Sequence, residues 1–150
     1  MDPQLKVVMS LWKRLSQWLR PAPPAIHLQR GRLGERVARA HLKRLGLKFL
    51  VANFRSGRGE IDLIFRDADC LVFVEVKARS SEEWGRPAAA IDRERRLRLT
   101  QCALDYLRRL RNPPVKMRFD VVEVLLGDGK VREIRHLPNT FPMSPPHRYG

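Results

Sequence analysis

Three stretches of the chain carry apolar residues at helical spacing, about every third or fourth position. The first, Leu5–Leu19, keeps its lysines and its arginine away from the main apolar stripe. The second, Gln29–Leu45, is followed by Gly46, a frequent helix stop. The third, Ala88–Arg111, runs into an asparagine and two prolines. The pattern predicts a helix in each stretch.

Five further stretches favour strands, because apolar residues alternate or run together between turn residues. They are Leu47–Ser56, Glu60–Arg66, Cys70–Arg79, Val115–Leu126 and Val131–Leu137. After the first helix, the order is helix, three strands, helix and two strands. A hairpin series followed by a helical crossover predicts an α/β fold with a mixed β-sheet flanked by helices.

The proline-rich segment Arg20–Ala25 separates the first helix from the rest. We expect an N-terminal amphipathic helix and linker over residues 1–25, one domain over 26–141 and an extended tail over 142–150. The first helix could pack against the domain or in a homodimer, bind another partner, or rest on a membrane surface, which its tryptophans would suit. The apolar runs are too short for a transmembrane segment.

The formal net charge of +14 in 150 residues predicts attraction to polyanions. The alternative is a soluble protein that is merely basic, but a surplus of this size in a short chain favours nucleic acid, without indicating which polymer. Cys70 and Cys102 have no metal-ligand spacing and are expected to be buried thiols, as in a reducing cytoplasm. The four histidines are scattered, so no zinc site is expected.

Charged residues interrupt two of the predicted strands. Glu75 and Lys77 share a face with Phe73. On the preceding strand, Asp62 shares a face with Glu60 and Ile64. A hairpin turn at Arg66–Asp69 would make these strands neighbours. We therefore expect Asp62 and Glu75 to converge near one end of the sheet, with Lys77 beside them.

Two interpretations of this cluster compete. Lys77 could neutralise Glu75 or Asp62 in a structural ion pair, but burying such a pair is expensive. Alternatively, both acids could supply the hard oxygen ligands of Mg²⁺ or Mn²⁺. In that case the cation would keep both carboxylates ionised and bridge to a phosphate. Lys77 would then orient or deprotonate a water molecule, or stabilise developing negative charge.

The third predicted helix carries arginines away from its apolar stripe. Arg95, Arg98 and Arg109 lie there, and Arg79 follows the charged strand. They are either a solvated basic face or contacts to backbone phosphates, which give affinity rather than sequence reading. The overall charge favours phosphate contacts. Asp120 is expected to be structural.

The sequence resembles a known nuclease superfamily. Asp62 and the segment Glu75-Val76-Lys77 match the D…(E)xK pattern of the PD-(D/E)XK nucleases, and the predicted element order is that of their restriction-endonuclease-like αβββαβ core. Together, six segments look like the bacterial YraN-like family, described as nuclease-like: Gly31–Leu42, Asn53–Ile64, Val72–Arg79, Gly85–Ile91, Arg118–Val124 and Ile134–Phe141. The resemblance covers nearly all of the chain except the N-terminal helix and linker.

The resemblance implies roles for particular residues. Asp62 and Glu75 match the metal-binding acids of the superfamily, and Lys77 matches its lysine. Glu35 matches an acid on the first core helix that some members, notably Holliday-junction resolvases, add to the site; from the residues alone it could equally stabilise the start of the helix. Arg95 stands where the family usually has a lysine, which keeps the charge but not the chemistry.

The function implied is a Mg²⁺- or Mn²⁺-dependent endonuclease acting on DNA phosphodiesters, including branched or recombining DNA. The name-giving proline of the superfamily is replaced here by Ile61, a tolerable change. The alternative is a nucleic-acid-binding protein that keeps the fold without useful catalysis. The complete set of Asp62, Glu75 and Lys77 favours the enzyme, because carboxylates facing phosphates would not help a protein that only binds.

Overall fold

The computed structural model describes residues 26–80 and 91–143. In chain order its elements are α2 (Ile26–Arg44), β1 (Lys48–Ser56), β2 (Gly59–Asp67), β3 (Cys70–Ser80), α3 (Arg93–Arg109), β4 (Lys116–Gly127) and β5 (Lys130–Phe141). The predicted order of helix, three strands, helix and two strands is confirmed. The predicted helix Leu5–Leu19, its linker and most of the predicted C-terminal tail lie outside the described residues.

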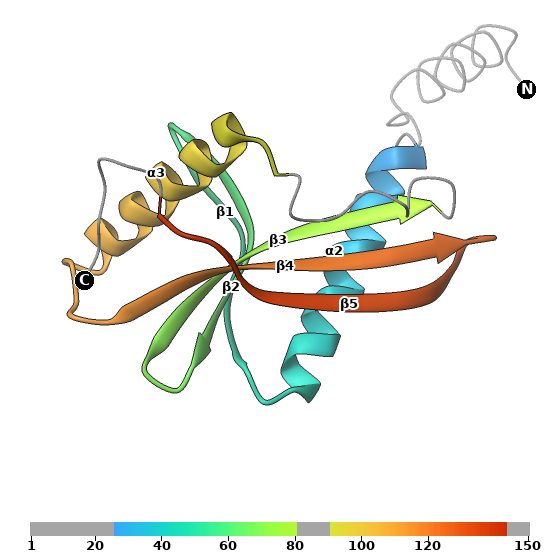
Figure 1. The fold of residues 1–150 in the computed structure, drawn as a ribbon, viewed down its shortest axis with the longest axis horizontal. Helices are drawn as coiled ribbons and strands as arrows, with labels where there is room; N and C mark the ends of the chain where they lie inside the picture. The colour runs from blue at the N-terminus through green and yellow to red at the C-terminus, as the bar shows by residue number, and fades with distance from the viewer. Residues whose placement is uncertain (1–25, 81–90, 144–150) are drawn as a thin grey trace, which may run out of the picture.

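The five strands form one sheet in the order β1-β2-β3-β4-β5 (Figure 1). Neighbouring strands are antiparallel except β3 and β4, which are parallel. Parallel neighbours cannot be joined by a tight hairpin, and here α3 lies in the connection between them. The sheet is therefore mixed, as the sequence predicts.

The two helices cover opposite faces of the sheet, because alternate residues of β3 belong to different apolar clusters. Val72 and Val74 pack with α2, whereas Leu71 and Phe73 pack with α3. The α2 cluster is formed by Ala38, Leu42, Leu47, Leu63, Phe65, Val72, Val74, Val122, Val124 and Leu126. The charged residues Glu75 and Lys77 continue the alternation of Phe73 and so belong to the α3 face.

Helix α3 begins later than the pattern of apolar residues suggests. Asp92 is its N-cap, and its side chain accepts a hydrogen bond from the backbone N–H of Arg95 at 2.7 Å. The predicted start at Ala88 is therefore wrong for residues 91 and 92, and residues 88–90 lie outside the described chain. The cap fixes the first turn of α3, which carries Arg95.

Strand β5 continues past its predicted end at Leu137 to Phe141. Pro138 is tolerated there because β5 is an edge strand of the sheet. Phe141 is buried and stacks on Phe119 of β4, with ring centroids 4.7 Å apart. Burial of this aromatic ring explains why the strand does not end before the proline.

Asp120 joins β4 to β5 through a buried polar network. Its carboxylate is fully buried and accepts hydrogen bonds from Arg118 at 2.9 Å and from the backbone N–H of Asn139 at 2.9 Å. His136 Nε2 lies 2.8 Å from the same carboxylate. Burial alone would raise the pKa of Asp120, but these partners outweigh it and hold the pKa below its usual value. This geometry fits the structural role expected for Asp120.

Candidate active site between β2 and β3

The backbone pairing of β2 with β3 ends at Leu63 and Val74. Just beyond this point, the Oδ2 atom of Asp62 accepts a hydrogen bond from the backbone N–H of Val76 at 2.7 Å. The carboxylate thus satisfies a donor that would otherwise be left unpaired where the strands separate. This contact places Asp62 against β3, next to Glu75, as the predicted hairpin requires.

Glu75 is only 6% exposed and is held by two cations. Arg95 donates from Nε to Oε1 at 3.2 Å and from Nη2 to Oε2 at 2.8 Å. Lys77 Nζ lies 3.6 Å from Oε1, with its side chain 34% exposed. The sequence analysis considered Lys77 as a partner of Glu75 but did not foresee Arg95, whose guanidinium is closer and makes the two-point contact.

Glu75 is close enough to Asp62 for its charge to affect the pKa of Asp62. Burial raises the pKa of Asp62 to about 7, the negative charge of Glu75 adds to the rise, and the N–H of Val76 opposes it. For Arg95, burial works against the charged form, but the hydrogen bonds and charge of Glu75 prevail and raise its pKa. Asp62 is therefore partly protonated near neutral pH in the metal-free protein.

Glu35 joins the site from α2 through Asn53 of β1. With its side-chain amide oriented toward the acids, Asn53 Nδ2 lies 3.2 Å from Glu35 Oε2 and 3.0 Å from Glu60 Oε1. Burial raises the pKa of Glu35, the amide lowers it, and the charges of Glu60 and Glu75 raise it. Glu35 thus lies in the same electrostatic environment as Asp62 and Glu75, and Glu60 is an additional acid.

Asn53 has an unusual backbone for a strand residue. Its φ is 52°, in the left-handed region, and the pairing of Ala52 with Leu63 and Phe54 with Ile61 places it opposite Asp62. Asparagine tolerates this region better than most residues, and strained backbone is concentrated at functional sites. The sequence analysis missed Asn53, although an asparagine inside an apolar strand was an available signal.

Glu123 is a second residue that the sequence analysis missed. It is the β4 neighbour of Lys77, is 2% exposed and has no hydrogen-bond partner for Oε1 within the described residues. Its other oxygen lies 3.6 Å from Arg135 Nη1. Residues paired across parallel strands point to the same face, so Glu123 adds negative charge beside Lys77.

The arginines expected to bind nucleic acid do not form one patch. Arg95 lies inside the site on Glu75. Arg98 pairs with Glu94 at 2.9 Å, on the same helix. Arg109, about 21 Å from Arg95 along the helix, covers the ring of Phe54 at 4.7 Å. Arg79 lies two residues beyond Lys77, near the end of β3.

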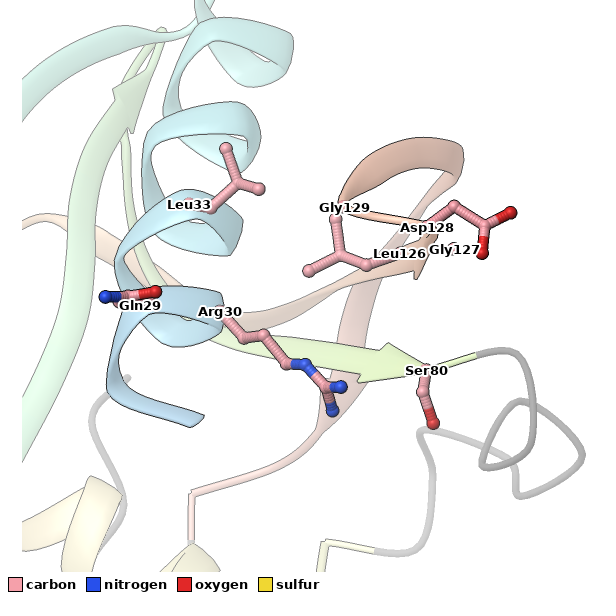
Figure 2. A pocket seen from close by; sticks show the side chains of 8 residues that line it. All are labelled: Gln29, Arg30, Leu33, Ser80, Leu126, Gly127, Asp128 and Gly129. Atoms are coloured by element: carbon pink, nitrogen blue, oxygen red, sulfur yellow. The ribbon is translucent and has the colours of Figure 1, made fainter. Parts of the chain in front are cut away.

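A hollow of about 410 Å³ lies near the end of β3, apart from the acids. Figure 2 shows it between the first turns of α2, Ser80 and the turn that joins β4 to β5, with the side chain of Arg30 extending from α2. Its acidic residue, Asp128, is paired with Arg132 at 3.1 Å. None of the predicted site residues lines this hollow.

The acids fit a divalent cation by their chemistry. Mg²⁺ commonly uses one or two protein carboxylates and keeps several water molecules, which Asp62 and Glu75 would allow. Within residues 26–80 and 91–143, no three His, Cys, Asp or Glu side chains are already arranged to hold a metal ion. Both oxygens of Glu75 are bonded to Arg95, so a cation would have to share or displace that contact.

The comparison with known sequences assigns the chain to a family. The model of the uncharacterised protein family UPF0102 matches residues 34–124, more than half of the chain. The chain is a UPF0102 protein. Within the matched segment lie the candidate site residues from Glu35 on α2 to Arg95 on α3.

UPF0102 proteins of several bacteria are similar to this chain. That of Syntrophus aciditrophicus is 43% identical over 100 residues, covering 67% of this chain and 79% of its own. That of Trichlorobacter lovleyi is 38% identical over 115 residues, covering 76% and 91%. That of Alkalilimnicola ehrlichii is 45% identical over 104 residues, covering 69% and 82%.

The remaining expectations concern the cysteines and the membrane. Cys70 and Cys102 are free thiols. Cys102 is buried as predicted, whereas Cys70 is only half-buried, because it lies at the β2–β3 turn. In the described part of the chain, no helix is long and apolar enough to cross a membrane.

Proposed function

We propose that this UPF0102 protein is a divalent-metal-dependent endonuclease that hydrolyses DNA phosphodiesters. The observation that carries the proposal is the meeting of Asp62 and Glu75 where β2 leaves β3, with Lys77 beside them and Asp62 raised to a pKa of about 7. Perturbed acids of this kind are concentrated at functional sites. Branched or recombining DNA is the proposed substrate class, by resemblance to the PD-(D/E)XK nucleases.

Each side chain has a proposed task. Asp62 and Glu75 would hold Mg²⁺ or Mn²⁺, which supplies positive charge for the phosphate and an activated water when bound. Lys77, partly exposed and 3.6 Å from Glu75, would orient the water or neutralise charge on the phosphate. Glu35 would contribute a further acid at the edge of the site, oriented by Asn53.

The second candidate is a nucleic-acid-binding protein without catalysis. One observation favours it: Arg95 already neutralises Glu75 by two hydrogen bonds, which is how a structural ion pair is built. Glu123, the β4 neighbour of Lys77, does not fit that alternative: its Oε1 is buried without a hydrogen-bond partner in the described part of the chain, which a purely structural site gains nothing from.

The test uses the purified full chain with labelled single-stranded, duplex and four-way DNA. The enzyme should cleave at least one of these with Mg²⁺ or Mn²⁺, and chelator should stop it. Asp62→Asn should remove cleavage, whereas Asp69→Asn, an exposed acid in the β2–β3 turn, should not. Cleavage that survives in Asp62→Asn would contradict the proposed site, and a wild type that binds but never cuts would favour the second candidate.

A further inference from the structure

Four basic residues of α2 form a continuous exposed row. They are Arg32, Arg36, Arg39 and Lys43, and we call this row the α2 ridge. At about 100° of rotation per residue, the four side chains fall within an arc of about 60°. At about 1.5 Å per residue, the ridge is about 16 Å long, which matches about five phosphates of one DNA strand at 3.4 Å each.

The α2 ridge carries positive charge that the described protein does not neutralise. Within residues 26–80 and 91–143, none of its four members forms an ion pair with a carboxylate. Arg39 instead stacks on the ring of Phe49, 3.6 Å from its centroid, which leaves its charge available. A hollow of about 440 Å³ lies among Arg36, Arg39, Ala40 and Lys43.

Helix α3 differs from α2 in this respect, although both are rich in arginine. Three of its arginines are paired with acids: Arg95 with Glu75 at 2.8 Å, Arg98 with Glu94 at 2.9 Å and Arg108 with Asp105 at 2.6 Å. A cation that already has an acidic partner gives less to a phosphate, because the existing pair must first be broken. Among the described residues, α2 therefore offers an unbroken row of four cations without an acidic partner, whereas α3 does not, and sequence reasoning did not single out this row.

The α2 ridge also borders the proposed site. Glu35 lies on α2 about 40° from the edge of the ridge. Burial raises the pKa of Glu35 and the positive charge of Arg32 opposes that rise, so the two share one electrostatic environment. Arg39 contacts Phe49 of β1, and Glu35 contacts Asn53 of the same strand. Arg39 and Glu35 therefore both lie on the side of α2 that faces β1.

We propose that the α2 ridge is the phosphate-binding track of the protein and leads a DNA strand past Glu35 to Asp62 and Glu75. The inference rests on the proposed function for its substrate, and it replaces α3 with α2 as the principal contact surface. Such contacts set affinity and register without reading sequence. The α2 ridge should therefore dominate the salt dependence of binding.

The experiment measures binding of the full chain to a fluorescent DNA duplex by anisotropy, with chelator present, between 50 and 200 mM salt. The ridge variant is Arg36→Gln/Lys43→Gln, which spares the stack of Arg39 on Phe49. Its slope of log K against log salt should fall by about 2, since each phosphate contact contributes about 0.9. The control, Arg98→Gln/Arg108→Gln, removes the same charge from α3 and should leave the slope unchanged.

A charge-preserving variant, Arg36→Lys/Lys43→Arg, should keep the wild-type slope, which attributes the loss to charge, and an unchanged melting temperature of the ridge variant excludes misfolding as the cause. Equal loss in the ridge variant and the α3 control would overturn the proposal, as would a wild type that does not bind the duplex. Loss of binding to phosphatidylserine vesicles in the ridge variant, with the duplex slope intact, would assign the α2 ridge to a membrane instead and likewise overturn it.

The outcomes separate this inference from the endonuclease itself. Asp62→Asn should lose cleavage but keep the full salt slope, because it changes the site and not the track. If the protein never cleaves but its salt slope depends on the α2 ridge, the endonuclease proposal is wrong and the phosphate-binding role of the α2 ridge stands. If the protein cleaves and the ridge variant binds DNA like wild type, only the phosphate-binding role of the α2 ridge is wrong.

Discussion

Arg95 binds both carboxylate oxygens of Glu75, at 3.2 Å and 2.8 Å, from the first turn of α3. Glu75, one of the two acids proposed as metal ligands, is therefore already paired with a positively charged side chain of the protein. Asp62 has no such cationic partner among the described residues, and its pKa is raised to about 7. A divalent cation must therefore compete with Arg95 for Glu75. Of the two acids, Asp62 is the one whose ionised form a cation would stabilise most.

Removing this competitor should change stability and metal affinity in opposite directions. Arg95→Ala should lower the stability of the metal-free protein by about 1–3 kcal/mol, because among the described residues it leaves the buried Glu75 with Lys77 as its one ion-pair partner. The same variant should bind Mn²⁺ more tightly in calorimetry. Arg98→Ala, on the same helix but paired with Glu94, is the control and should change neither quantity. Weaker Mn²⁺ binding in Arg95→Ala would show that Arg95 assists the cation rather than competing with it.

The raised pKa of Asp62 predicts a pH-dependent gain from neutralising it. Below about pH 4, Asp62 is protonated in both the folded and unfolded states, so Asp62→Asn should have little effect. Between the usual 3.8 and about 7, the unfolded state releases the proton first, and wild-type stability falls as pH rises. In metal-free thermal melts, Asp62→Asn should therefore be more stable than wild type at pH 8, by up to about 4 kcal/mol. A difference that is constant from pH 4 to 8 would argue against the shift.

Much of this site follows from strand alternation and one hairpin. The two-residue period places Glu75 and Lys77 on the face of Phe73, and the turn after Asp67 brings Asp62 beside them. These relationships are local and depend only on which residues point the same way. The sequence therefore predicts the fold class and the meeting of the two acids.

The remaining features depend on tertiary geometry that a linear pattern does not contain. The partner of Glu75 is Arg95, which reaches it only because Asp92 caps α3 and sets where the helix begins. Likewise, β5 extends through Pro138 because Phe141 stacks on the ring of Phe119, which is a contact between residues distant in sequence. Each correction comes from a long-range contact that overrides a local signal.

A divalent cation should stabilise the folded protein through Asp62 and Glu75. At a concentration one hundred times its Kd, a ligand that binds only the folded state adds about 2.7 kcal/mol. Millimolar Mn²⁺ or Mg²⁺ should therefore raise the melting temperature of wild type, and the gain should vanish in Asp62→Asn/Glu75→Gln. The exposed acid Asp69 provides the control, since Asp69→Asn should keep the full gain. Absence of metal binding, even with nucleic acid present, would make the two acids a structural pair.

Lys77 should matter for cleavage and not for folding or binding. It is partly exposed, and Glu75 keeps Arg95 as a partner when the ammonium is removed. The free energy of unfolding of Lys77→Ala should therefore lie within about 1 kcal/mol of the wild-type value, and the variant should bind DNA equally well. Its cleavage rate should fall at least 100-fold, the usual size of a positioned acid–base or electrostatic contribution. Lys116→Ala, which removes an exposed lysine paired with Asp69, should cleave normally. A Lys77→Ala protein that cuts like wild type would remove Lys77 from the mechanism.

Asn53 allows its backbone role to be separated from its side-chain role. Its φ of 52° is accessible to glycine without strain but costs alanine about 1 kcal/mol, so Asn53→Gly should melt higher than Asn53→Ala by about that amount. Both variants lose the amide that contacts Glu35 and Glu60, so both acids should repel each other more strongly and the pKa of Glu35 should rise further. Carboxyl titration by NMR would follow this rise directly. If Asn53 orients Glu35 for the chemistry, the two variants should lose the same cleavage activity despite their different stability. Activity that instead tracks the melting temperature would assign Asn53 to the fold of β1 alone.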